Sequence, residues 1–302
     1  MEASVSGNVP VVQNADKTSE MRLVATYNMS PLGAGAREAY VRLKSGTDES
    51  PTFISVGRFN VPFGLLTDEH RTYTRLQTNM TLNNFSNGAA VSGNFSKLYY
   101  DFALVDDFQG TGNFTMGDVT YGAVLNLRWA PATLPFFVGA SQNFEYSQVQ
   151  PEPYATSVYT ALSFDRLTSD AIPGSFIFEA VSARNWNSST LNSGLSTFFI
   201  PSTDSAYLAS IASSQSLGFY TQVKWDINNR WSIFYKFDSL ELSSQFTGDA
   251  FLRSGLGFEV FINSNLILNT RAEYSTVTRS EIQSSGVLAA QSDFLAMLRL
   301  WL

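Results

Sequence analysis

The segment SLGFYTQVKWD, Ser216–Asp226, alternates between two kinds of side chain. One set is mostly apolar and consists of Leu217, Phe219, Thr221, Val223 and Trp225. The other set is small or polar and consists of Ser216, Gly218, Tyr220, Gln222, Lys224 and Asp226. A period of two residues predicts a β-strand with one apolar face and one hydrated face.

Three further segments, ending at Ser275, repeat this alternation. Their apolar positions are Trp231, Ile233, Tyr235, Phe237, Leu252, Leu256, Phe258, Val260, Ile262, Leu266, Leu268, Ala272 and Tyr274. A transmembrane strand needs about 9–11 residues that alternate between lipid and lumen. The four segments therefore predict consecutive strands of an all-β, antiparallel transmembrane barrel, with the apolar face toward lipid and the charged face toward a lumen.

The composition fits such a barrel and excludes several other classes of protein. Of the 302 residues 44% are hydrophobic, yet the mean hydropathy is −0.04. No run approaches the roughly 18 apolar residues of a membrane helix. The net charge of −7 argues against a nucleic-acid partner. With no cysteine and one histidine, His70, the chain offers no Cys-based zinc site, multi-His site or covalent haem attachment, and we expect no cofactor.

The first twenty residues differ from the rest of the chain because they are small and polar. We expect residues 1–20 to form a periplasmic segment or an extra strand, and residues 21–302 to form the barrel. Met1–Val5 lacks the basic and then apolar pattern of a signal peptide. We therefore expect a mature chain of the bacterial outer membrane, without its signal peptide.

The predicted connections alternate between tight turns and long loops. The tight turns are Ser96–Lys97, Ala130–Thr133, Ile227–Arg230 and Asn263–Ser264, and the long loops are Leu65–Gly88, Asp106–Gly117, Asn185–Ser214 and Thr276–Gly286. Short periplasmic turns and long extracellular loops are typical of outer-membrane barrels, which have an even number of strands. We expect about 14 strands, or 16 if Ala3–Val9 adds one and a second remains unrecognised.

Three tryptophans support this orientation. Trp129, Trp225 and Trp231 flank predicted tight turns and lie on the apolar face. Tryptophan is favoured at the lipid–water boundary because its ring is apolar and its N–H needs a polar partner. They would form a periplasmic aromatic girdle; the alternative is the core of a soluble sandwich.

Short segments resemble a known family. Val56–Gly64, VGRFNVPFG, resembles the Gly-Arg-Phe and Pro-Phe-Gly segment of phosphate-selective-type porins of the bacterial outer membrane. Gly257–Leu266 followed by Arg271–Tyr274 looks like the penultimate hairpin of such porins. Leu298–Leu302 is similar to the C-terminal assembly signal of outer-membrane proteins, although Trp301 is second to last. Phe63–Arg75 also resembles the barrels that sheath multihaem cytochromes in porin–cytochrome conduits. The resemblance implies an outer-membrane β-barrel porin.

The predicted lumen face carries charges of both signs. The expected pore-lining residues are Glu38, Arg42, Arg58, Asp118, Arg128, Glu145, Lys224, Lys236, Asp238, Arg253, Glu259, Arg271 and Glu273. Their mixture favours a hydrated lumen crossed by ion pairs, without the Lys or Arg cluster that a phosphate-selective pore requires. Phosphate specificity is therefore not carried over from the resemblance. The alternative is that these charges only brace one another.

One long loop is a candidate constriction. The segment Leu65–Gly88 concentrates Asp68, Glu69, His70, Arg71 and Arg75. Such a loop could fold into the barrel and narrow it. A solvated outer loop with a short helix is the alternative. A second long loop, Asn185–Ser214, could cap the mouth.

Three classes of function compete on this evidence. A hydrolase would have to use His70 with Asp68, and no nucleophile motif accompanies them, so we expect no enzyme. A barrel that sheaths a partner such as a multihaem cytochrome, or a plugged barrel, is the second class. The third, which we favour, is a Gram-negative porin-like channel for passive diffusion of ions and small polar solutes. Expected partners are outer-membrane lipid, further copies of the chain and a periplasmic or cytochrome protein.

Overall fold

The computed structural model describes most of the chain. The described residues are 3–14, 18–30, 33–65, 72, 74, 85–106, 120–147, 154–168, 173–184, 215–241, 243–244, 250–263, 266–277 and 291–300. Among them, no helix combines the length and the apolar character needed to span a membrane.

Within the described ranges, fifteen strands form one sheet in the order of the sequence, and every neighbouring pair is antiparallel. The strands are β1 (Ala3–Gln13), β2 (Ser19–Ser30), β3 (Gly33–Ser45), β4 (Thr52–Asn60), β5 (Phe85–Phe95), β6 (Leu98–Val105), β7 (Thr120–Trp129), β8 (Phe136–Ser147), β9 (Tyr154–Ser163), β10 (Gly174–Arg184), β11 (Gln215–Asn228), β12 (Trp231–Glu241), β13 (Ala250–Asn263), β14 (Leu266–Val277) and β15 (Gln291–Leu300). A short helix, α2 (Phe164–Thr168), lies between β9 and β10. The predicted all-β antiparallel fold is confirmed, with a strand number between the two expected values.

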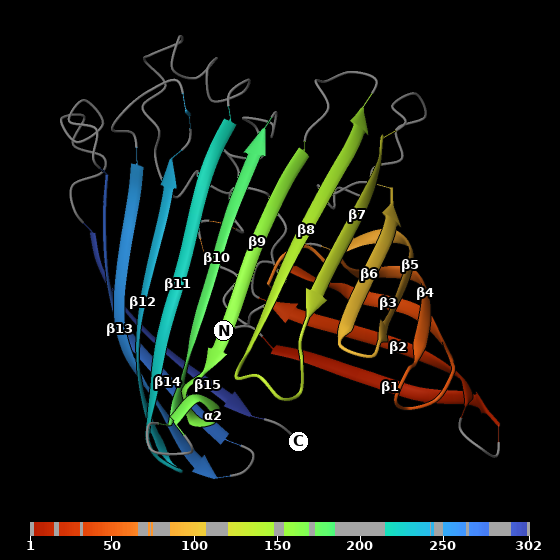
Figure 1. Ribbon diagram of the computed structural model, residues 1–302, viewed down its shortest axis with the longest axis horizontal. Helices are drawn as coiled ribbons and strands as arrows, with labels where there is room; N and C mark the ends of the chain where they lie inside the picture. Colours follow the sequence, from red (N-terminus) through yellow and green to blue (C-terminus); the bar gives the residue numbers. More distant parts are fainter. Residues whose placement is uncertain are drawn as a thin grey trace.

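The sheet curls round, and strands near its two ends pass behind the front strands β8–β11 (Figure 1). Among the described residues, β1 has a strand ladder with β2 only, and β15 has one with β14 only. We call the edge of the sheet with the β5–β6 and β11–β12 connections the turn end, and the opposite edge the loop end. At the loop end, residues 31–32 connect β2 to β3, so the alternation of short and long connections is not complete.

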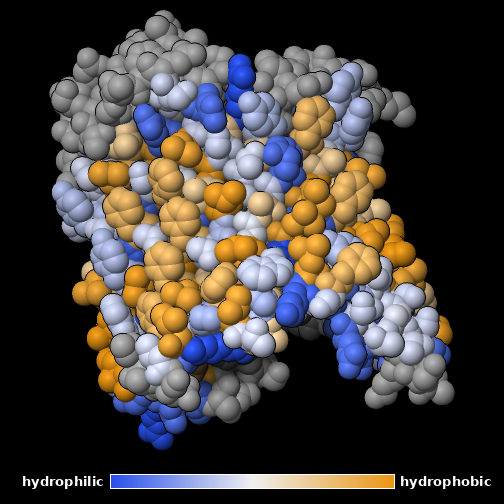
Figure 2. All heavy atoms as spheres, in the orientation of Figure 1, coloured by the Kyte–Doolittle hydropathy of each residue, from blue (hydrophilic) through white to orange (hydrophobic). Residues whose placement is uncertain are grey.

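Side chains on the two faces differ as the period of two predicts. Large apolar side chains are exposed on the outer face of nearly every strand, and Figure 2 shows them spread over the middle of the front strands. Trp129, Trp225 and Trp231 are all exposed at the turn end of this face. Each lies close to a further aromatic ring, with ring centroids 6.0–6.2 Å apart. The outer face therefore has the apolar surface and aromatic band of a membrane strand sheet.

The inner face, which carries the buried polar side chains, is closely packed on β12–β14. Two glycines of β13 make room there. Gly255 is paired with Lys236 and with Glu273, and Gly257 is paired with Phe234. A Cβ atom on Gly257 would lie 2.5 Å from the Thr270 carbonyl oxygen and 2.8 Å from the Arg271 Cβ.

We predict that Gly257→Ala destabilises the folded barrel by about 1–3 kcal/mol, because the backbone carbonyl of Thr270 cannot yield to the added methyl group. Gly7→Ala in β1 is the matched control, since nothing lies within 4 Å of a Cβ there. Urea unfolding of the refolded protein in micelles measures both changes. Equal stability of the two variants would contradict this account of the packing.

Candidate functional site: the inner face of the sheet

The segment Val61–Leu65 continues from β4 onto the inner face. Val61, Phe63 and Leu65 are buried, and Phe63 has no exposed surface. The Gly64 N–H donates to the Ser141 Oγ of β8 at 2.8 Å. The Leu65 N–H donates to the Glu179 Oε1 of β10 at 2.9 Å. Because β8 and β10 lie four and six strands away from β4, these bonds place the segment inside the curved sheet.

Glu179 is the main attachment point of this inward segment. Its carboxylate is buried and also accepts the Ser157 hydroxyl at 2.8 Å. The Thr74 hydroxyl donates to its Oε2 at 3.4 Å, so a second part of the same connection reaches the same carboxylate. A buried carboxylate that accepts several hydrogen bonds is held firmly and in turn fixes its donors.

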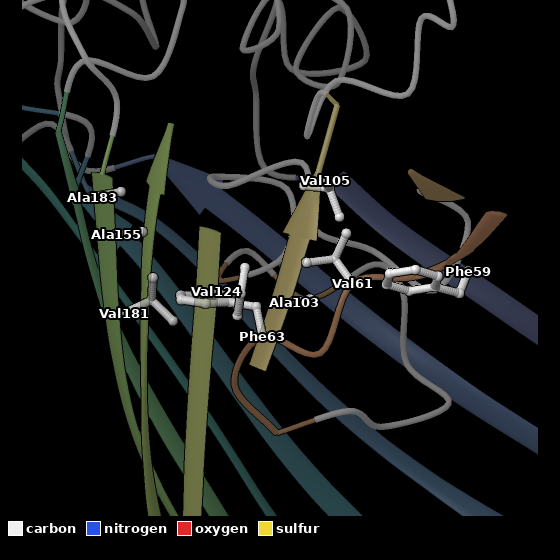
Figure 3. Packing of buried hydrophobic residues seen from close by; sticks show 9 residues of the cluster. All are labelled: Phe59, Val61, Phe63, Ala103, Val105, Val124, Ala155, Val181 and Ala183. Atoms are coloured by element: carbon white, nitrogen blue, oxygen red, sulfur yellow. The ribbon is translucent and has the colours of Figure 1, made fainter. Parts of the chain in front are cut away.

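Apolar contacts complete the attachment. The buried cluster contains Phe59, Val61, Phe63, Ala103, Val105, Val124, Ala155, Val181 and Ala183. Figure 3 shows Val61 and Phe63 among side chains of β6, β7, β9 and β10. The strands contribute mainly alanine and valine to the cluster, and these small side chains leave the volume that the Phe63 ring occupies.

A chain of hydrogen bonds continues from the inward segment toward the turn end. The Ser141 hydroxyl, which accepts the Gly64 N–H, donates to Asn126 Oδ1 at 2.7 Å. The same oxygen accepts the Tyr159 hydroxyl at 2.6 Å. Gly139 lies opposite Tyr159, and a side chain there would collide with the tyrosine ring. The segment is thus joined to the five neighbouring strands β6–β10 through polar and apolar contacts.

The opposite part of the inner face, on β12–β14, is a wall of buried ion pairs. Lys236 pairs with Glu273, and each side chain is 1% exposed. Arg271 Nε lies 2.9 Å from Glu273 Oε1. Arg253 donates to Asp238 Oδ2 from Nε at 3.0 Å and from Nη2 at 2.8 Å. Buried charges are tolerated only with such partners, because desolvation of an unpaired ion costs several kcal/mol.

A further pair continues this wall toward the turn end. Lys224 of β11 pairs with Glu259 of β13, and the Asn269 amide donates to Glu259 Oε1 at 2.9 Å. These groups are less deeply buried than the pairs on β12–β14.

Most of the charged residues expected to line a pore lie on the inner face. They are Glu38, Arg42, Arg128, Glu145, Lys224, Lys236, Asp238, Arg253, Glu259, Arg271 and Glu273. Arg58 does not, and its predicted position is corrected. It is paired with the exposed Ala39 and lies two residues from the exposed Val56, so the alternation turns it to the outer face.

Other predicted residues fall outside the described part of the chain. These are Asp118, the loop residues Asp68, Glu69, His70, Arg71 and Arg75, and the proposed cap Asn185–Ser214. Sequence reasoning did not single out Glu179, Ser141 or Asn126. Each of them is a polar side chain at an inner position of a strand with alternating polarity. Such side chains are too common in this sequence to identify an attachment point. Within the described residues, no group of three His, Cys, Asp or Glu side chains could hold a metal ion.

We predict that Glu273→Ala lowers the free energy of unfolding by about 3–5 kcal/mol, because it deprives the buried Lys236 and Arg271 of their shared carboxylate. Arg22→Ala is the control. Arg22 pairs with Glu20 at 2.8 Å but is 40% exposed, and such a pair contributes at most about 1 kcal/mol. Urea unfolding in micelles compares the variants. A loss no larger than that of Arg22→Ala would show that water reaches the β12–β14 wall.

Comparisons with known proteins agree on the architecture. No protein-family profile and no curated protein sequence matches the chain. Similar solved structures include the outer-membrane channel DcaP of Acinetobacter baumannii, with a TM-score of 0.61, 10% identity, and coverage of 99% of this chain and 84% of that one. An anion-selective porin from Comamonas acidovorans has a TM-score of 0.62, 8% identity, and coverage of 99% and 89%. OmpF of Salmonella typhi, in complex with daunomycin, has a TM-score of 0.64, 10% identity, and coverage of 99% and 90%. The chain therefore has the fold of the bacterial outer-membrane porins.

Proposed function

We propose that this protein is an outer-membrane channel for passive diffusion of ions and small polar solutes. The observation that carries the proposal is the segment Val61–Leu65, which is bound inside a curved sheet whose outer face is apolar and whose inner face is polar. An internal segment of this kind narrows a lumen, and its position sets which solutes pass. The turn end would face the periplasm and the loop end the cell exterior.

The charge on the inner face supports a lumen of mixed character. On β12–β14, Lys236 and Arg271 share the Glu273 carboxylate and Arg253 pairs with Asp238, so most of the charge on this wall is compensated and these pairs leave one cation in excess. The remaining described charges are of both signs, including Glu38, Arg42, Asp101 and Arg128. The similarity to porins also supports a non-enzymatic channel. Assembly with further copies of the chain or with a periplasmic protein stays a prediction.

The direct test is single-channel conductance of the refolded protein in a planar lipid bilayer, with ion selectivity from the reversal potential. We expect steady open steps and weak selectivity, because most charges on the wall of ion pairs compensate one another. A folded barrel that shifts its electrophoretic mobility on heating but conducts no current would contradict the channel function.

We predict that Glu179→Ala increases single-channel conductance and current noise. The substitution removes the acceptor of the Leu65 N–H, and loss of a buried hydrogen bond to a charged group costs about 1.5–3 kcal/mol. The inward segment should then move more freely. Thr156→Ala, at an exposed position on the outer face of the adjacent strand, is the control and should conduct like the unchanged protein. Conductance unaffected by Glu179→Ala would mean that the segment does not limit the pore.

A further inference from the structure

Two arginines of the inner face are held by aromatic rings and not by carboxylates. The Arg128 Cζ lies 4.9 Å from the ring centroid of Tyr99 and 5.6 Å from that of Phe137. The Arg42 Cζ lies 5.1 Å from the Tyr40 centroid. Lys236 and Arg253, on β12 and β13, instead form ion pairs with carboxylates. The two parts of the inner face therefore use their cations differently.

These groups gather at the turn end. Tyr99 is the second residue of β6 and is paired directly with Arg128, the residue before the last of β7. Phe137 is the second residue of β8. Phe53, whose ring centroid is 5.7 Å from the Arg42 Cζ, is the second residue of β4. The inward segment Val61–Leu65 follows the loop end of β4 and reaches Ser141, whose acceptor Asn126 is the inner-face position next to Arg128 on β7. Arg128 therefore lies just on the turn-end side of the segment.

The hydrogen-bonding capacity of the two guanidinium groups is mostly unused by the described residues. A guanidinium has five N–H donors. Arg42 donates from Nη2 to the Tyr40 hydroxyl at 3.0 Å and from Nε to the Ser55 Oγ at 3.3 Å. Arg128 makes ring contacts but no hydrogen bond or ion pair within the described part of the chain. Within the described residues, therefore, no protein acceptor uses its N–H donors.

A guanidinium packed against aromatic rings is well prepared to bind a carboxylate. The two ring contacts of Arg128 restrict its side chain, so less side-chain entropy is lost when two parallel N–H donors meet two carboxylate oxygens. The Tyr99 ring is 36% exposed and offers apolar surface beside the charge. Asp101, two residues further along β6, carries the opposing charge, and both Arg128 and Arg42 act on it electrostatically. The cluster keeps one net positive charge.

We propose that Arg128 and Arg42, with the rings of Tyr99 and Phe137, form a binding station for small organic carboxylates at the turn end of the lumen. The guanidinium edge of Arg128 receives the carboxylate, and the apolar body of the solute lies on the Tyr99 ring. The negative charge of Asp101 weakens the binding of a carboxylate and keeps it reversible, as passage through a channel requires. The station rests on the proposed channel function, because it presumes that solutes enter the lumen.

The test uses ¹⁹F NMR of 4-fluorobenzoate added to the full-length protein refolded in detergent micelles. We expect the unchanged protein to broaden the fluorine signal, and Arg128→Gln to weaken binding about tenfold through loss of a charge-assisted bidentate pair. Arg128→Lys, which keeps the charge but not the planar fork, should recover part of the affinity. Asp101→Asn should tighten binding, an effect that loss of a merely structural residue would not produce.

Lys97→Gln is the matched control, because it removes one positive charge from the exposed β5–β6 turn. It should bind 4-fluorobenzoate like the unchanged protein, and the neutral 4-fluorobenzyl alcohol should not bind. Equal binding of the alcohol, or binding that Arg128→Gln leaves unchanged, overturns the station. If Arg128→Gln does not fold, 4-fluorobenzoate binding is measured with Arg42→Gln and Asp101→Asn instead. Failure of Asp101→Asn to tighten binding counts against the station.

The micelle measurement separates this proposal from the channel function. A protein that conducts in bilayers but does not bind 4-fluorobenzoate overturns the station alone. A protein that binds 4-fluorobenzoate through Arg128 but never conducts overturns the channel and leaves a carboxylate site on the inner face.

Discussion

Hydrogen bonding of the backbone between neighbouring strands is the constraint on which the rest of the structure depends. In lipid, each unsatisfied N–H or C=O group costs several kcal/mol, so the chain must pair its strands along their whole length. From β2 to β14 every strand has two antiparallel neighbours. Once the register is fixed, alternation assigns every side chain to the outer or the inner face, and a shift of one residue would exchange the two sets. The ladder thus determines both the lipid surface and the lumen surface.

The inner face deals with its polar groups in three different ways. Glu179 binds the inward segment, so its carboxylate stabilises tertiary structure. Lys236 and Glu273 form an ion pair in a space opened by Gly255. Arg128 lies over rings and keeps its donors for the lumen. The same alternation of polar residues along the strands therefore supports attachment, ion-pair packing and ring contacts of cations, and the difference arises from which partners the register brings opposite.

Sequence periodicity predicted those parts of the fold in which the two faces differ strongly in polarity. The hairpin of β5 and β6, with its Ser96–Lys97 turn, and the four strands β11–β14 are examples. The strand β1, ASVSGNVPVVQ, shows little contrast between its faces and contains a proline beside a register shift, so its pattern was weak. Arg58 was expected on the inner face, but the exposed side chains of Ile54 and Val56 fix the alternation along β4 and place Arg58 on the outer face. The bond from Leu65 to Glu179 joins residues 114 positions apart, which no local pattern can reveal.

Side-chain volume differs between the two sides of the inner face. Around β6–β10 the inner positions include Ala103, Ala155 and Ala183, all without exposed surface, and their small volume admits the Phe63 ring. Around β11–β13 the inner face instead carries Tyr220, Phe234 and Lys236, which are themselves buried. One side of the inner face is therefore filled by the inward segment, and the other side is filled by the long side chains of its own strands. At the turn end, no described carboxylate forms an ion pair with Arg42 or Arg128, so under the proposed channel function these guanidinium groups would face a solute in the lumen.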